Sequence, residues 1–378
     1  MCRRSRARYF LGMGNVLPGV FAFGIGSVLA IGALVPWTAA EYRRHGQLGV
    51  RRSLVAFGTL VYALALVTYT LLPLPADVAT MCAAPASAQL TPFAFVGDIV
   101  KEGGISGPRS LLTNPAIAQV LFNVLLFVPL GALARHAVAR RRLLGGLLVG
   151  LGTGVVVSLL IELTQLTGNW FLYPCAYRLF DVDDLMANTA GAVVGTLLAP
   201  LVGLLAGSDD PVDADRPRPV TAARRFSGML SDVLAIWLLS GALSVGTTLA
   251  WALADRDDED PVLAVLVTIG ALVAPAVQLV VVLASGRTLG EHVVRLRPTP
   301  RPGAGRRLLR WALGSGGWAT LLALDLPLFA FVASLLAIAS VIAVWSTRGR
   351  RGLALAVLRV DVEDERTARE GASARSGA

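Results

Sequence analysis

Charged residues are scarce in this chain of 378 residues. Asp, Glu, Lys and Arg make up 16% of it, whereas hydrophobic residues make up 55% and the mean hydropathy is +0.65. A soluble domain carries roughly 25% charged residues. This shortage excludes an ordinary soluble globular protein and predicts an all-α, multi-pass protein of the cell membrane.

Cysteine and histidine are also rare, with three of each. No Cys-x-x-Cys pair occurs, so the sequence offers no thiolate metal site. The series Gly150-x-Gly152-x-Gly154 follows no strand and precedes no Walker lysine, which excludes a phosphate-binding loop. We therefore expect no metal and no cofactor. The glycines instead predict close packing between helices.

Apolar runs of about 18 residues or more recur along the chain, as in membrane-spanning helices. The last run, 312–345, is too long for one ordinary span and contains Asp325 and Pro327, so we divide it into two shorter helices. About nine spans result, in two bundles of five and four. They are 16–39, 53–74, 116–134, 143–166, 185–206, 229–253, 261–284 and the two parts of 312–345.

Basic residues are concentrated between the apolar runs. The net charge of +9 therefore reflects membrane topology, with arginine clusters on the cytoplasmic side, rather than a nucleic-acid partner. The clusters lie at 43–52, 135–142, 216–225, 287–310 and 348–351. The segments with few basic residues, which we expect outside, are 75–115, 168–183 and 255–260.

The N-terminal arginines do not fit this pattern, because Arg3 to Arg8 would lie outside if Arg43 lies inside. Either 9–39 forms a re-entrant pair, or residues 1–12 are not synthesised and translation begins at Met13. We favour the second explanation. The sequence has no small-residue cleavage site before the apolar run continues, so we do not expect a cleaved signal peptide.

Two cysteines, Cys82 and Cys175, fall in segments expected outside the cell membrane. An oxidising exterior permits a disulfide, and we predict one between them. Two free thiols are the alternative.

A polar, proline-rich stretch at 207–223 divides the chain and predicts a cytoplasmic linker. It separates a five-span module, 13–206, from a four-span module, 224–360. The tail, 361–378, is charged and rich in Gly, Ser and Ala, and we expect it to be disordered.

Glu162 is the most informative residue, because it places a carboxylate inside the apolar run 143–166. An ionisable group near the centre of a spanning helix costs about 2.5 to 3.5 kcal/mol on insertion scales. Glu162 and Gln165 share one helix face. Glu162 either binds a headgroup, cation or proton, or stabilises the bundle by pairing with Arg178 or Gln165.

A second polar group follows the run. Asp181, Asp184 and Asn188 are spaced by three and four residues, so they share one face of a helix that begins near Asp181. Asp181 or Asp183 is a plausible N-cap for that helix. Earlier in the chain, Asn123 precedes a proline that frees backbone carbonyls.

These motifs resemble the VanZ-like family over roughly 50–205. They are Asn123-x3-Phe127-x-Pro129-Leu130-Gly131, Glu162-x2-Gln165, and Arg178-x2-Asp181-x-Asp183-Asp184-x3-Asn188-x2-Gly191-x3-Gly195. The resemblance implies an all-helical membrane domain linked to low-level resistance to glycopeptide antibiotics such as teicoplanin, without a defined reaction. The predicted ligand-binding residues are Asn123, Glu162, Gln165, Arg178, Asp181, Asp184 and Asn188.

Residues 222–360 resemble the RDD family more weakly, through Arg225, Asp232 and the loop that contains Thr288. Glu291 stands where that family has a lysine, and Ala354 stands where it has a closing aspartate. The resemblance implies ion or solute transport. In the alternative interpretation, Arg225 and Asp232 form an interfacial ion pair.

Three classes of function fit these residues. In the first, which we favour, Arg178 holds phosphate and the carboxylates hold an amine, sugar or cation of a lipid-linked envelope precursor, a membrane lipid or a glycopeptide. In the second, Glu162 or Asp184 is the general base of a membrane hydrolase or transferase. No nucleophile–base pair accompanies these acids, so we lean against an enzyme. In the third, the protein is structural.

Overall fold

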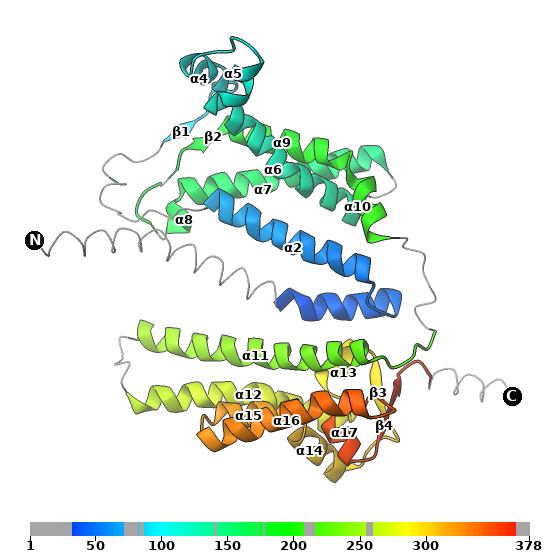
Figure 1. The fold of residues 1–378 in the computed structure, drawn as a ribbon. Coiled ribbons are helices and arrows are strands. Elements are labelled where there is room, and N and C mark those ends of the chain that lie inside the picture. Colours follow the sequence, from blue (N-terminus) through cyan, green and yellow to red (C-terminus); the bar gives the residue numbers. More distant parts are fainter. Residues whose placement is uncertain are drawn as a thin grey trace, which may run out of the picture. The chain divides into compact units, whose positions relative to one another are not determined.

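The computed structural model describes residues 32–71, 82, 87–139, 142–171, 173–176, 178–207, 216–254 and 260–367. They belong to two compact units (Figure 1), and each is described by itself. Residues 49–208 form the body of the first unit, and residues 28–48 and 209–378 form the second. The predicted leader 1–12, the start at Met13 and residues 16–31 of the predicted span 16–39 lie outside the described residues.

The described part of the first unit contains five apolar helices, together with the shorter elements given below. The N-caps fit the sequence: the Asn114 side chain accepts hydrogen bonds at the start of α6, where Pro115 occupies the first position, and the Asp181 side chain caps α9. Of the two N-cap candidates that the sequence offers, Asp181 and Asp183, the structure has Asp181. The helices are α2 (Val50–Leu71), α6 (Pro115–Val138), α7 (Leu143–Leu166), α9 (Val182–Thr196) and α10 (Ala199–Ala206).

Short elements lie at one end of these helices (Figure 1). Strand β1 pairs in parallel with β2, which brings the segment after Cys82 to the start of α9. These elements are β1 (Ala88–Gln89), α4 (Phe95–Lys101), α5 (Pro108–Thr113), α8 (Gly168–Phe171) and β2 (Phe180–Asp181).

Glycines set the distance between α9 and its neighbours. A Cβ atom on Gly191 or Gly195 would fall onto the backbone of α6, at the carbonyls of Val124 and Val128. A Cβ on Gly154 of α7 would lie 2.9 Å from the Thr189 Cα. These helices therefore pack backbone to backbone, as the glycine spacing predicts.

The second unit contains a helix over 32–45 and three long apolar helices. Its elements are α11 (Ala222–Leu253), α12 (Pro261–Ser285), α13 (Leu289–Val293), β3 (Leu296–Thr299), α14 (Ala304–Ala312), α15 (Ser315–Ala323), α16 (Pro327–Ser346), α17 (Leu353–Val357) and β4 (Asp361–Asp364). Tyr42, Val294, Leu296 and Leu355 are buried together in a small core.

The prediction of a disordered tail from residue 361 is wrong for its first residues. Strand β4 pairs antiparallel with β3, with Leu296 opposite Asp364. The Asp364 carboxylate is buried and accepts a hydrogen bond from Arg224 Nη1 at 2.8 Å. Contacts with residues far away in the sequence thus order a segment whose composition alone indicates disorder. The tail from residue 368 lies outside the described residues.

The described residues contain six helices long and apolar enough to cross a membrane, or seven if α9 and α10, bent by 52°, form one span. This supports a multi-pass membrane protein. Of the nine predicted spans, the first, 16–39, is described only from residue 32. The run 312–345 does divide near Asp325, but α15 has only nine residues and is too short to be counted as a span.

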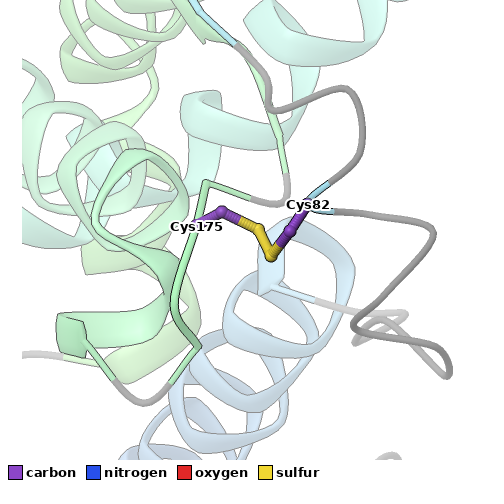
Figure 2. The surroundings of a disulfide bond; sticks show 2 residues. All are labelled: Cys82 and Cys175. Carbon is purple, nitrogen blue, oxygen red and sulfur yellow. A yellow bond between two sulfur atoms is a disulfide. The ribbon is translucent and has the colours of Figure 1, made fainter.

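The first unit contains a disulfide between Cys82 and Cys175, 93 residues apart, with their Cα atoms 5.7 Å apart (Figure 2). It joins the segment before β1 to the segment before β2. The two strands and the disulfide therefore hold the same pair of loops together.

We expect Cys82→Ser to lower the free energy of unfolding by about 4 kcal/mol, because the cross-link removes the entropy of a long loop from the unfolded chain. Thermal unfolding of the purified protein in neutral detergent measures this change. Cys175→Ser is the matched control: each single variant and the double variant should lose the same amount, since all three lack one bond. Additive losses would contradict the disulfide.

Candidate ligand-binding site

The site forms at one end of the first unit, where α6 and α9 begin and α7 ends. Asp181 is the last residue of β2 and caps α9, with its Oδ1 accepting the Asp183 N–H at 2.9 Å. The backbone N–H of Asp181 in turn donates to Glu162 Oε2 at 2.9 Å. This hydrogen bond joins the end of α7 to the start of α9.

Glu162 is only 2% exposed. Within the part of the chain that the structure describes, the Asp181 N–H is its one hydrogen-bond donor. The Glu162 carboxylate also interacts electrostatically with Asp184, Asp181 and Arg178, so all three lie near it. A buried carboxylate normally accepts several hydrogen bonds. Glu162 therefore has accepting capacity that the described residues leave open.

Asp184 lies one helical turn beyond the cap and is half-buried. Its Oδ1 accepts a hydrogen bond from Asn123 Nδ2 at 2.6 Å, and Gln119 is a second side-chain partner. Gln119 and Asn123 are four residues apart and share one face of α6. Sequence reasoning missed Gln119, although this spacing was a signal that could have identified it.

Arg178 lies nearby but does not neutralise the carboxylates through direct contact. Its side chain is exposed, and Nη1 donates to the Thr70 carbonyl over 3.4 Å. Gln165 Nε2 donates to the same carbonyl at 2.7 Å. Among the described residues Arg178 forms no ion pair, and Gln165 donates to Thr70 rather than to Glu162. The structure therefore does not contain the alternative in which Glu162 pairs with Arg178 or Gln165.

Two neighbouring polar residues have other partners. Asp183 accepts the backbone N–H groups of Phe93 (2.6 Å) and Phe95 (2.9 Å), and so anchors the loop that leads into α4. Asn188 lies one turn deeper in the bundle than Asp184 and donates to Ser158 Oγ at 3.0 Å. Asn188 is therefore separated from the carboxylates by a turn of helix.

The resulting site is a carboxylate cluster, defined as Glu162, Asp181 and Asp184, with Arg178 at its edge. Burial raises the pKa of Asp181, and Asp183 and Asp98 raise it further, although backbone N–H groups oppose them. No group of described His, Cys, Asp or Glu residues has metal-binding geometry. The arrangement favours a ligand that donates hydrogen bonds or carries positive charge.

The second unit contains a separate polar network. Arg225 Nη1 donates to Glu291 Oε1 at 2.6 Å, and Arg310 pairs with Glu291 Oε2. Asp232 instead accepts Gly290 N–H at 2.7 Å, Gln278 Nε2 at 2.8 Å and the Thr288 hydroxyl. The proposed Arg225–Asp232 ion pair is therefore wrong, because Glu291 takes its place.

These features define a multi-pass helical membrane protein with a carboxylate cluster at one end of its first unit. Residues 59–203 match the VanZ/LLP1 family, so this integral membrane protein carries a VanZ/LLP1 domain, as the sequence motifs predicted. The comparison gives no support for an RDD domain in the second unit. No curated protein and no solved structure matches the chain.

Proposed function

We propose that the VanZ/LLP1 domain binds the polar head of an envelope lipid or amphiphile at its outer end. Binding there would lower the sensitivity of the cell to lipophilic glycopeptide antibiotics such as teicoplanin. The observation that carries this proposal is the carboxylate cluster: Glu162 is buried with one described hydrogen bond beside two further carboxylates, and Arg178 is not ion-paired with any of them among the described residues.

Buried charge without a partner is costly, and a ligand that supplies the missing donors gains the corresponding free energy. An ammonium or hydroxyl group of the ligand would donate to Glu162 and Asp184. The exposed guanidinium of Arg178 would donate hydrogen bonds to a phosphate or carboxylate of the same head. Among the described residues neither Glu162 nor Asp184 is hydrogen-bonded to a Ser, Thr or Cys side chain, so binding is favoured over activation of a nucleophile.

The topology supports an outward-facing site. The arginine cluster at 135–142 follows α6, whereas the carboxylate cluster lies at the other end of that helix. Cys82 and Cys175 are at the carboxylate end, and a disulfide persists in an oxidising compartment. The nine-span arrangement in two bundles remains part of this proposal.

The test compares the teicoplanin sensitivity of a deletion strain that expresses wild type, Glu162→Gln or Asp184→Asn. Each variant preserves side-chain shape and removes one negative charge. We expect both to lose at least half of the protection that wild type provides, at unchanged membrane abundance. Abundance is measured in the same cells by quantitative immunoblotting.

Asp183→Asn is the matched control, because it removes an equal charge from an anchor of the α4 loop outside the carboxylate cluster. It should reduce abundance and protection together. If Glu162→Gln and Asp184→Asn behave in the same way, these acids are structural and the binding proposal is wrong. If wild type gives no protection, the antibiotic part of the proposal is wrong.

A further inference from the structure

The second unit contains an open cavity of about 500 Å³ between α11 and α16, with α15 and α17 completing its wall. Most of its lining is apolar and includes Phe226, Leu230, Val233, Trp318 and Leu336. Ligand pockets in proteins typically measure about 300 to 1,000 Å³. The cavity is therefore large enough for one small or single-chain ligand.

One part of the cavity is charged. Arg225, Glu291 and Arg310 line it, and both carboxylate oxygens of Glu291 are occupied by the two arginines. Arg225 is 7% exposed, and its Nε has no hydrogen-bond partner. Arg225 and Arg310 therefore share the carboxylate of Glu291, and Arg225 keeps a hydrogen-bond donor that Glu291 does not use.

Asp232 also lines the cavity, and its carboxyl group already accepts three hydrogen bonds, from the Gly290 N–H, Gln278 and the Thr288 hydroxyl. The hydrogen-bond donor without a partner in the polar part of the cavity is thus the Nε of Arg225. A buried N–H without an acceptor is destabilising. An anionic oxygen is the acceptor that a guanidinium binds most strongly.

The apolar part of the cavity opens toward the membrane. Leu230 on α11 and Val341 on α16 both line it, yet they are 50% and 43% exposed. Helix α11 has 32 residues, so at about 1.5 Å per residue it exceeds the roughly 30 Å hydrocarbon core. Arg225 lies in its first turn and therefore near the headgroup level, while the lining beyond it lies at acyl-chain depth.

We propose that this cavity binds one single-chain anionic lipid. Its phosphate or carboxylate contacts Arg225, and its acyl chain lies between α11 and α16. This site is distinct from the carboxylate cluster of the first unit and does not depend on the function proposed for it.

Native mass spectrometry of the full chain, purified in neutral detergent, tests the proposal. The probes are oleic acid, 1-oleoyl-lysophosphatidic acid, uncharged monoolein and inorganic phosphate. We expect one bound copy of either anionic lipid and at least tenfold weaker binding of monoolein. Binding of both anionic lipids supports the shared chemistry, and their relative affinities distinguish carboxylate from phosphate.

Two variants address the two parts of the cavity. Arg225→Gln removes the positive charge, and Ala337→Phe fills the apolar lining without altering the charged residues. Each is expected to weaken binding of the anionic lipids at least tenfold. Arg297→Gln removes an equal charge outside the cavity and should leave binding unchanged.

Four results would overturn the proposal. Equal binding of monoolein excludes a site for an anionic head, and displacement of the lipid by inorganic phosphate alone excludes a role for the tail. Wild-type affinity in a folded Arg225→Gln excludes the assigned contact. If Arg225→Gln does not fold, wild-type affinity in Ala337→Phe excludes the cavity.

Discussion

Gly195→Ala is expected to lower the thermal unfolding midpoint in detergent by about 10 °C, corresponding to about 3 kcal/mol. The reason is the contact between α6 and α9. The added Cβ would fall onto the Val128 carbonyl of α6, and that atom is backbone that cannot rotate away. The two helices must therefore separate, and their other close contacts at Gly131 and Gly191 weaken with them.

Gly152→Ala is the matched control for this substitution. Gly152 lies on α7, and a Cβ added there meets nothing within 4 Å. Alanine is the better helix former by about 1 kcal/mol in soluble hosts, so this variant should be neutral or slightly stabilised. Equal unfolding midpoints for the two variants would contradict the close packing of α6 against α9.

Glu291→Gln is expected to destabilise the second unit by about 3 kcal/mol at neutral pH. The carboxylate is 2% exposed and pairs with both Arg225 and Arg310. Removing its charge leaves two buried guanidinium groups without a counter-ion. Thermal unfolding of wild type and variant at pH 7 measures the loss.

The pH dependence of this difference has a definite sign. Burial by itself would raise the pKa of Glu291, but Arg310 and Arg225 lower it to about 2. The stabilisation is therefore fully present above the pKa of the unfolded chain, about 4.3, and is lost as the pH falls toward 2. Wild type and Glu291→Gln should thus converge in stability between about pH 4.3 and 2.

Glu363→Gln is the control, since Glu363 and Arg297 form an ion pair on the surface, with side chains 27% and 36% exposed. Such pairs contribute about 0 to 1 kcal/mol. If Glu363→Gln lowers the free energy of unfolding as much as Glu291→Gln does, the stabilisation by the Glu291 ion pairs does not result from their burial.

Several features of the fold follow from local sequence. Apolar runs bounded by charged or turn residues predicted a helix over 143–166, and α7 has these bounds. The runs also predicted α6 and α12 to within a few residues. The glycine spacing predicted close packing, because only the absence of a side chain permits it. The outward segments predicted the pairing of Cys82 with Cys175, which the structure contains.

The site is different, because the three aspartates at the start of α9 have different partners. Asp181 caps α9, Asp183 anchors the loop at Phe93, and Asp184 contacts Asn123 of α6. Helical spacing places Asp181 and Asp184 on one face, but it cannot show which loop crosses that face. Likewise, Glu291 looked like a departure from a motif, whereas in the structure it is the counter-ion of two arginines.

Buried arginines show the same limit. The cluster at 135–142 predicted topology only, yet Arg135 is buried and donates to the Thr196 carbonyl at 2.8 Å, at the end of α9. Arg224 is buried in a similar way against Asp364. Local charge counts report on which side of the membrane a segment lies, but not on the carbonyl or carboxylate that an individual arginine contacts.

The sequence by itself determined that this is a multi-pass helical membrane protein, where several of its helices lie, and that residues 59–203 form a VanZ/LLP1 domain, because hydropathy and motif spacing are local properties. Only the tertiary structure decided that Glu162 lacks an ion-paired partner among the described residues, that Glu291 holds two arginines, and that β4 pairs with β3. Each of these depends on residues tens of positions apart, and their distances are set by packing.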